Sequence, residues 1–271
     1  IALAGTGVGK SMFMCSCAAA NLKDHKNVLY ITLELAEERV AERIDANLLD
    51  CPIGDLADLP RNVYEKRMAK LRETSKGKLI IKEYPTASAG SANFRHLIQE
   101  LKLKKNFIPD VIYIDYLNIC TSSRIKAGSN VNSYTVIKAI AEELRGLAVE
   151  FNVPIISATQ TTRSGFSNSD VGLEDTSESF GLPATADFMF ALITSEELAA
   201  LNQIMVKQLK NRYNDPDRFK RFVVSVDKAK MRLMDAEDAT DDLVDDTPVM
   251  DKTQIGQRMQ DERKSLFEGF K

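Results

Sequence analysis

Short apolar runs alternate with longer amphipathic stretches along most of this 271-residue chain, and this alternation limits the possible folds more than any other feature. Eight runs rich in β-branched and aromatic residues predict strands. They are residues 1–3, 28–33, 79–82, 111–114, 155–158, 188–194, 204–209 and 222–226. Strands that alternate with helices are typical of a mostly parallel, twisted sheet flanked by helices, so the predicted fold class is α/β.

Five amphipathic stretches predict the helices that connect these strands. They are residues 11–22, 36–49, 63–74, 92–102 and 133–151. No run approaches the roughly 18 uninterrupted apolar residues of a membrane span, and no charged-then-apolar leader precedes the first strand. We therefore expect a cytoplasmic protein with no membrane partner. The four cysteines show no paired metal-binding spacing, which indicates reduced, buried thiols.

Charge divides the chain into two parts near residue 234. Residues 1–234 carry 31 basic and 28 acidic side chains, whereas residues 235–271 carry 5 basic and 11 acidic ones. The acidic stretch 235–251 has no aromatic residue and cannot bury enough surface to fold alone. We expect one folded domain over 1–234, followed by an acidic, disordered tail over 235–271. The mildly basic body permits contact with nucleic acid at local loops.

The stretch "AGTGVGKS", residues 4–11, follows the first predicted strand and opens the first predicted helix. In that arrangement backbone N–H groups of the loop can surround phosphate oxygens, and the helix N-terminus adds its positive dipole. Lys10 would neutralise the β- and γ-phosphates, and Ser11 would ligate Mg²⁺. The usual pattern begins with glycine, whereas Ala4 stands here. The predicted nucleotide-binding residues are Gly5, Thr6, Gly7, Val8, Gly9, Lys10 and Ser11.

Two acidic residues at the ends of predicted buried strands would complete this site. Asp115 in "PDVIYIDYL" is placed to hold the metal through a water molecule. Glu34 in "YITLELAEERV" lies at the same edge of the sheet, where its carboxylate can accept a proton from the attacking water. The alternative for Glu34 is an acid at a helix N-terminus, which the helix dipole favours.

Polar residues at the ends of two later strands extend the pattern. Gln160 can sense the γ-phosphate as a neutral donor and acceptor, and a hydrogen-bonded core glutamine is the alternative. Lys210 and Arg212 in "QLKNRYND" stand two residues apart, on the same face if the strand continues. Because they point away from their own phosphate loop, they indicate a role in trans, across a subunit boundary. Charges at a solvated sheet edge are the alternative.

Taken together, these motifs resemble the RecA-type motor domain of the DnaB-like replicative helicases, with the bacteriophage members nearest. The resemblance covers about residues 1–234 and rests on Ala4-x-x-x-x-Gly9-Lys10-Ser11, Leu33-Glu34, Ile114-Asp115-Tyr116, Gln160 and Lys210-x-Arg212. It implies a RecA-like P-loop NTPase core, in which alanine is frequent at the first phosphate-loop position. It also implies a homo-hexamer that encircles single-stranded DNA and moves 5′ to 3′ as ATP, with Mg²⁺, is hydrolysed at subunit interfaces.

The resemblance also implies roles for individual residues by their matching positions. Lys10 and Ser11 would bind phosphate and metal, Glu34 would be the base, Asp115 would support Mg²⁺, Gln160 would be the sensor, and Lys210 with Arg212 would act in trans. Arg43, nine residues beyond Glu34, falls on a position that the family commonly keeps basic. For Arg43, an ion pair on the helix surface is the alternative.

Two polar loops, residues 121–132 and 161–175, directly follow predicted strands at the edge where α/β folds bind ligands. In the resembling family such loops line the pore of the ring. The implied DNA contacts are Arg124, Lys126 and Gly128 in the first loop and Arg163, Ser164 and Gly165 in the second. A third contact region resembles residues 178–181, but Ser177 stands where bacterial relatives tend to have arginine.

Two other classes of function compete with the helicase. A RecA-like recombinase or regulatory ATPase would not unwind DNA, and it tends to have two lysines where this chain has Lys210 and Arg212. A small-molecule kinase would need a lid-like arginine cluster, which is not visible in the sequence. We therefore favour the helicase.

The resemblance bears on both ends of the chain. Family members carry an N-terminal collar domain and a linker helix that are absent here, so we expect a fragment with weakened hexamerisation. The tail could bind a primase, a helicase loader or a polymerase, with a solubilising tail as the alternative. If a phage encodes the protein, the expected location is the host cytoplasm.

Overall fold

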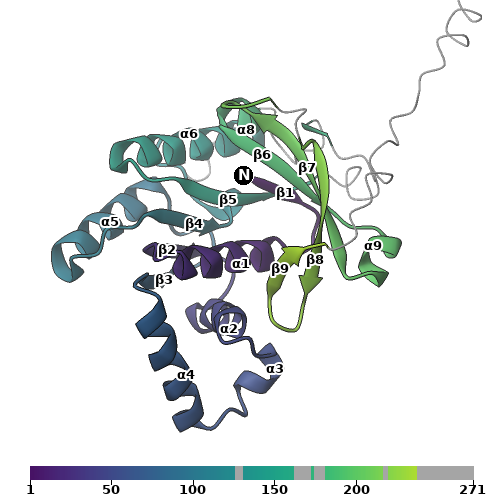
Figure 1. Cartoon of the computed structure of the whole chain (residues 1–271). Helices are drawn as coiled ribbons and strands as arrows, with labels where there is room; N and C mark the ends of the chain where they lie inside the picture. The colour runs from purple at the N-terminus through teal and green to yellow at the C-terminus, as the bar shows by residue number, and fades with distance from the viewer. Residues whose placement is uncertain (126–130, 162–171, 174–180, 216–218, 237–271) are drawn as a thin grey trace, which may run out of the picture. The chain divides into compact units, whose positions relative to one another are not determined.

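A computed structural model of the chain describes residues 1–125, 131–161, 172–173, 181–215 and 219–236 (Figure 1). Ile1–Glu237 form one compact unit, and the remainder, Asp238–Lys271, lies outside the described residues. Within the described part, nine strands form one sheet in the order β3-β2-β4-β5-β1-β6-β7-β8-β9. The strands are β1 (Ala2–Ala4), β2 (Val28–Thr32), β3 (Leu79–Glu83), β4 (Val111–Asp115), β5 (Ile155–Gln160), β6 (Phe188–Ile193), β7 (Gln203–Asn211), β8 (Arg221–Asp227) and β9 (Arg232–Asp235).

Helices connect these strands and cover the sheet on both faces (Figure 1). They are α1 (Lys10–Lys23), α2 (Glu37–Leu48), α3 (Ile53–Leu56), α4 (Arg61–Thr74), α5 (Ser91–Lys105), the 3₁₀ helix η1 (Leu117–Ile119), α6 (Ser133–Phe151), α8 (Gly181–Thr185) and α9 (Glu196–Ala200). Within the part of the chain that the structure describes, every helix is too short or too polar to span a bilayer.

The sheet has a parallel part and an antiparallel part. The strands from β3 to β6 pair in parallel, and β7, β8 and β9 follow as an antiparallel extension. The predicted α/β class with a mostly parallel sheet is therefore confirmed. All eight predicted strands and five predicted helices are present, with ends shifted by a few residues.

The sequence analysis missed β9 and four short helices. β9 has only four residues, and its pairing with β8 rather than an apolar run defines it. The helices α3, η1, α8 and α9 span three to five residues, too few to show a helical period. We predicted that the loop beginning at residue 121 directly follows β4. This was wrong, because η1 lies between them.

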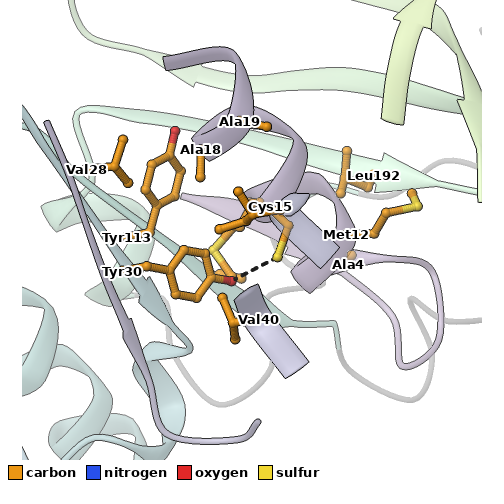
Figure 2. Packing of buried hydrophobic residues seen from close by; sticks show 14 of the residues in the cluster. Ala4, Met12, Cys15, Ala18, Ala19, Val28, Tyr30, Val40, Tyr113 and Leu192 are labelled. Carbon is orange, nitrogen blue, oxygen red and sulfur yellow. Dashed lines mark hydrogen bonds between the residues drawn. The ribbon is translucent and has the colours of Figure 1, made fainter. Parts of the chain in front are cut away.

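Two apolar clusters hold the helices to opposite faces of the sheet. One joins α1 and α2 to the central strands, and Figure 2 shows Tyr30 and Tyr113 beside Cys15 and Ala18 in this cluster. The two tyrosine rings stack with centroids 5.8 Å apart. The other cluster joins α5 and α6 to the opposite face. Each fully buried apolar side chain of this kind contributes about 1.5–3 kcal/mol, so both clusters fix the sheet that positions the site.

Candidate active site at the carboxyl edge of the sheet

The strand order brings the predicted nucleotide-site residues to one edge of the sheet. β2, β4, β5 and β1 are neighbours and run in parallel, so their carboxyl ends lie side by side. Ala4 at the end of β1 pairs with Gln160, and Thr32 at the end of β2 pairs with Asp115. Glu34 follows two residues after Thr32. The phosphate loop, Asp115, Gln160 and Glu34 therefore meet at the edge where open α/β folds bind ligands.

The loop between β1 and α1 has the backbone conformation that its glycines permit. Gly7 and Gly9 have φ values of 80° and 115°, in the region where a side chain is strained. A Cβ on Gly9 would also lie 3.2 Å from Met12 Cε. Lys10 is buried, and its Nζ donates to the carbonyl oxygens of Ala4 and Gly5 at 3.4 and 3.2 Å. The Lys10 side chain thus folds back onto the start of its own loop.

The charge of Lys10 depends on its acidic neighbours. Burial lowers the pKa of Lys10, while the nearby carboxylates of Glu34 and Asp115 raise it in part. Glu34 itself is exposed in the turn after β2, so its carboxylate is accessible to water. Lys10 and Glu34 are therefore electrostatic neighbours, although two strands separate β2 from β1.

Asp115 is a buried carboxylate that is only partly hydrogen-bonded. It is 1% exposed, its Oδ2 accepts a hydrogen bond from the Tyr30 hydroxyl at 3.1 Å, and its buried Oδ1 has no hydrogen-bond partner among the described residues. Burial raises the pKa of Asp115, and the hydroxyls of Ser11 and Tyr30 lower it in part. A buried carboxylate oxygen without a donor, close to the Ser11 hydroxyl, is suited to a hard cation or its water.

The described residues contain no group of three or more His, Cys, Asp or Glu side chains that could hold a metal ion by themselves. A magnesium ion here would depend on Ser11, on Asp115 and on phosphate oxygens from the nucleotide. Such reliance on one or two protein ligands plus phosphate is usual for Mg²⁺. The residues present therefore fit a magnesium ion that binds together with a nucleotide.

Gln160 is linked to the phosphate loop through Tyr116. Its Nε2 donates to the Tyr116 hydroxyl at 3.2 Å, and Lys10 Nζ lies 6.0 Å from the centre of the Tyr116 ring. The Asp115–Tyr116 peptide bond is cis. The partner of Gln160 therefore packs against the apolar core with its ring and lies beside Lys10 in the candidate site.

Arg43 lines a cavity of about 750 Å³ beside the start of α2. Its guanidinium is near enough to lower the pKa of Asp115. Its helix neighbour Arg39 pairs with Glu42 at 2.8 Å, whereas Arg43 has no ion-pair partner among the residues the structure describes. The predicted alternative of a surface ion pair for Arg43 therefore finds no support.

Lys210 and Arg212 lie at the opposite end of the sheet. Lys210 pairs with Met189 near the amino end of β6, whereas the phosphate loop follows the carboxyl end of β1. β7 ends at Asn211, so Arg212 lies just beyond the strand. In Figure 1, the marked N-terminus and α8 lie at the amino end of β1 and β6, and α9 lies beyond the carboxyl end of β6.

Arg124 is the predicted DNA contact whose surroundings the structure describes. Its guanidinium donates to Glu142 at 2.7 Å and to the Ala139 carbonyl at 2.9 Å, so it is held against α6. The neighbouring Glu143 accepts hydrogen bonds from three serines around this loop. They are Ser91, Ser122 and Ser123. The other predicted contacts, Lys126, Gly128, Arg163, Ser164 and Gly165, lie outside the described residues, as does Ser177.

Residues 1–214 match the family described as "DnaB-like helicase C terminal domain". The chain belongs to the DnaB-like helicase family. The family prediction made from the motifs is thus confirmed.

Individual relatives agree with this assignment. The chain is 49% identical over 240 residues to the "DnaB-like replicative helicase" of Enterobacteria phage T4, a match that covers 88% of this chain and 50% of that relative. It is 26% identical to the "Replicative DNA helicase DnaB" of Helicobacter pylori, over 68% of this chain and 37% of that relative. The chain therefore spans about half the length of such relatives, or less.

Solved structures agree on the fold. The structure described as "The Structure Of A DnaB-Like Replicative Helicase And Its Interactions With Primase" matches with a TM-score of 0.70 at 18% identity, covering 87% of this chain and 57% of that one. A second solved structure, that of an isolated ATPase domain, matches with a TM-score of 0.69 at 18% identity, covering 87% of this chain and 84% of that one. These matches show that the α/β fold of this DnaB-like domain is shared with both solved structures.

Motif spacing did not predict the partners of Tyr30, Tyr116 or Glu143, although Tyr116 belongs to the Ile114-Asp115-Tyr116 motif. Tyr30 and Tyr116 are placed by neighbouring strands, and their hydroxyls meet Asp115 and Gln160. Glu143 lies in the middle of a helix whose sequence gives no sign of its serine partners. The tyrosine in "VLYIT" is a polar-tipped residue in a buried strand, and this was the signal available for Tyr30.

Proposed function

We propose that the chain is the motor domain of an ATP-dependent replicative DNA helicase that works as a homo-hexamer on single-stranded DNA, moving 5′ to 3′. Family membership and the arrangement of the carboxyl edge support this proposal. Since the family match is to helicases, it favours this function over a recombinase or a regulatory ATPase.

The residues of the carboxyl edge have complementary roles in this proposal. Backbone N–H groups of residues 5–10 bind the triphosphate, and Lys10 exchanges its carbonyl partners for phosphate oxygens. Ser11 and Asp115 hold Mg²⁺, which when bound neutralises charge on the phosphates. Glu34 accepts the proton of the attacking water, since its carboxylate is exposed beside Lys10.

Two side chains connect the nucleotide to the rest of the domain. Gln160 lies beside the γ-phosphate and senses it, because its present partner, the Tyr116 hydroxyl, belongs to the same site. Arg43 adds positive charge near Asp115, whose pKa it helps to lower. Both residues lie on elements that lead away from the site, as a sensor requires.

The position of Lys210 and Arg212 is the single observation that carries the hexamer. Lys210 lies two strands to the side of β1 and three residues nearer the amino end than Ala4, according to the strand register. At about 4.8 Å per strand and 3.3 Å per residue, this places it roughly 14 Å from the end of β1, and Arg212 lies farther away. Cations at that distance cannot reach their own phosphates, so they serve a neighbouring subunit.

The remaining partners follow from the family and from the charge pattern. Single-stranded DNA contacts Arg124, Lys126 and Gly128 in one loop and Arg163, Ser164 and Gly165 in the other, by its phosphate backbone rather than its bases. The acidic tail, residues 235–271, binds a primase, a loader or a polymerase. As a phage-encoded protein, it acts in the cytoplasm of the host cell.

An ATPase assay over a range of protein and oligonucleotide concentrations tests the proposal. We expect the rate per subunit to rise with protein concentration, as subunits assemble, and to rise further with single-stranded DNA. Forked-duplex unwinding by the intact protein is the second expected result. A rate per subunit that is indifferent to dilution and to DNA would contradict both the hexamer and the helicase.

A further inference from the structure

Asp187 lies in the turn between α8 and β6 and is the centre of a small charged cluster at the amino end of the sheet. Its Oδ1 accepts from Arg212 Nη1 at 2.5 Å and from Arg145 Nη2, on α6, at 3.0 Å. Its backbone carbonyl also accepts from the Arg212 N–H at 2.9 Å. One residue therefore fixes both the backbone and the guanidinium of Arg212.

The end of α8 supplies the other acceptors of this cluster. Lys210 Nζ donates to the carbonyl oxygens of Pro183 and Ala184 at 2.6 and 3.2 Å, and Arg212 Nη2 donates to Ala184 at 3.1 Å. Asp187 lies between α8 and β6, so the same short segment carries Asp187 and the carbonyl groups of Pro183 and Ala184. Lys210 and Arg212 thus rest on the same short segment of backbone.

These contacts leave Arg212 able to bind a further anion. A guanidinium has five N–H donors, and the contacts to Asp187 and Ala184 occupy one on each terminal nitrogen. The side chains of Arg212 and Asp187 are 35% and 33% exposed, so the pair lies at the surface. Positive charge also exceeds negative charge in the cluster, because Arg145, Lys210 and Arg212 surround one carboxylate. Asp187 therefore orients the cations without neutralising them.

We propose that Asp187 is a positioning residue that holds Arg212 and Lys210 in the orientation needed to contact the triphosphate bound by the neighbouring subunit. The inference rests on the proposed function, in which these two cations act in trans. Reactions that depend on oriented groups lose much of their rate when such a group is misplaced by about 1 Å. Exposed ion pairs, by contrast, contribute little to folding stability. Loss of Asp187 should therefore affect turnover far more than it affects folding.

Asp187→Asn tests this directly, since it removes the charge and keeps the shape. In the intact protein we expect kcat for ATP to fall about tenfold with little change in KM, because the phosphate loop is untouched. The midpoint of urea unfolding should not move. Asp187→Glu should recover part of the rate. The matched control is Glu150→Gln, which breaks the exposed Arg95–Glu150 pair at the far end of α6 and should leave kcat unchanged.

Mixing experiments distinguish action in trans from a local defect. Lys10→Ala subunits have a defective phosphate loop but intact cations, so they can complement a subunit that lacks only the cations. In an equal mixture with Asp187→Asn subunits, about one interface in four pairs the two intact halves, so the rate should approach a quarter of wild type. This is well above the mean of the two variants measured alone.

An equal mixture of Lys10→Ala and Arg212→Ala subunits separates the positioning role of Asp187 from the action of Arg212 in trans. If that mixture recovers activity but Asp187→Asn has the kcat of wild type, the positioning role is wrong and the proposed function stands. If Asp187→Asn is slow and Lys10→Ala does not rescue it, Asp187 acts within its own subunit and the inference fails. If Arg212→Ala is not rescued either, the action of Arg212 in trans fails.

Discussion

The two ends of the sheet hold their charged residues in different states. At the carboxyl edge, Asp115 keeps a buried oxygen that has no hydrogen-bond partner in the part of the chain that the structure describes, and burial lowers the pKa of Lys10. At the amino end, Arg212 already donates to Asp187 and Ala184. The first region has groups that a ligand would satisfy, whereas the second has its cations fixed in advance. In the proposed function, the parallel strands gather the residues that one subunit uses on its own nucleotide, and the antiparallel strands carry the cations that would serve the neighbouring subunit.

Lys10→Ala should have the largest effect, because it removes the buried cation of the phosphate loop. We expect no measurable ATP turnover, since even a single lost charge-stabilising contact costs about 100-fold or more. Turnover is measured with saturating DNA. Lys104→Ala, an exposed helix-surface lysine, serves as the control. Retained turnover in Lys10→Ala would remove this residue from the site.

Arg212→Ala should have the next largest effect and tests the other end of the sheet. We expect kcat to fall about 1,000-fold with nucleotide affinity retained, as for the loss of an arginine finger. In mixtures with wild-type subunits the rate should fall in proportion to the wild-type fraction, because each interface needs one intact Arg212. Arg61→Ala, which removes a 91% exposed arginine, is the control. An undiminished rate in these mixtures would argue against the action of Arg212 in trans.

Tyr30→Phe should have a smaller effect on the carboxyl edge. It removes the hydroxyl that donates to Asp115 and helps to lower the pKa of that carboxyl, so Asp115 should protonate at a higher pH. We expect the Mg²⁺ concentration for half-maximal turnover to rise a few-fold and unfolding to become easier by about 1 kcal/mol. Tyr113→Phe is the matched control, because its hydroxyl accepts from Asn21 instead. Equal Mg²⁺ curves for the two variants would contradict the role of Tyr30.

Glu143→Gln should have the smallest effect on turnover, because Glu143 touches a loop and not the nucleotide site. Burial raises the pKa of Glu143, but hydrogen bonds from Ser122, Ser91 and Ser123 together lower it from 4.5 to about 2. The ionised form therefore stabilises the folded state, fully above pH 4.5, and that stability is lost as the pH falls toward 2.

The measurement for Glu143 is the urea midpoint at several pH values from about 7 downward. Wild type should lose more stability than Glu143→Gln between pH 4.5 and the lowest pH at which it remains folded. At neutral pH the variant should be the less stable of the two. Parallel curves for both proteins would show that Glu143 does not account for the acid sensitivity.

The sequence predicted the carboxyl edge well, because that edge depends on local rules. An apolar run followed by a polar residue places Asp115 and Gln160 at strand ends, and glycine spacing defines the phosphate loop. The fold class and the family were predictable for the same reason. The roles of the individual residues, including those that lie outside the described ranges, stay predictions.

The amino end was less predictable, because its contacts join distant parts of the chain. Asp187 meets Arg145 and Arg212, which come from a helix and from the end of a later strand. α8 is one turn long and gives no periodic signal. Tyr30 likewise finds Asp115 only through strand pairing. Patterns within a short window cannot predict partners that the sheet order brings together.

The place of β1 has a consequence for how the chain folds. This three-residue strand lies between β5 and β6, so both of its partners are contributed by residues 155–160 and 188–193. On a ribosome, the phosphate loop must wait until residues 155–193 have been synthesised before β1 has both of its partner strands. Such distant pairing slows folding, because the entropy cost of closing a long loop comes before the favourable free energy of the strand contacts.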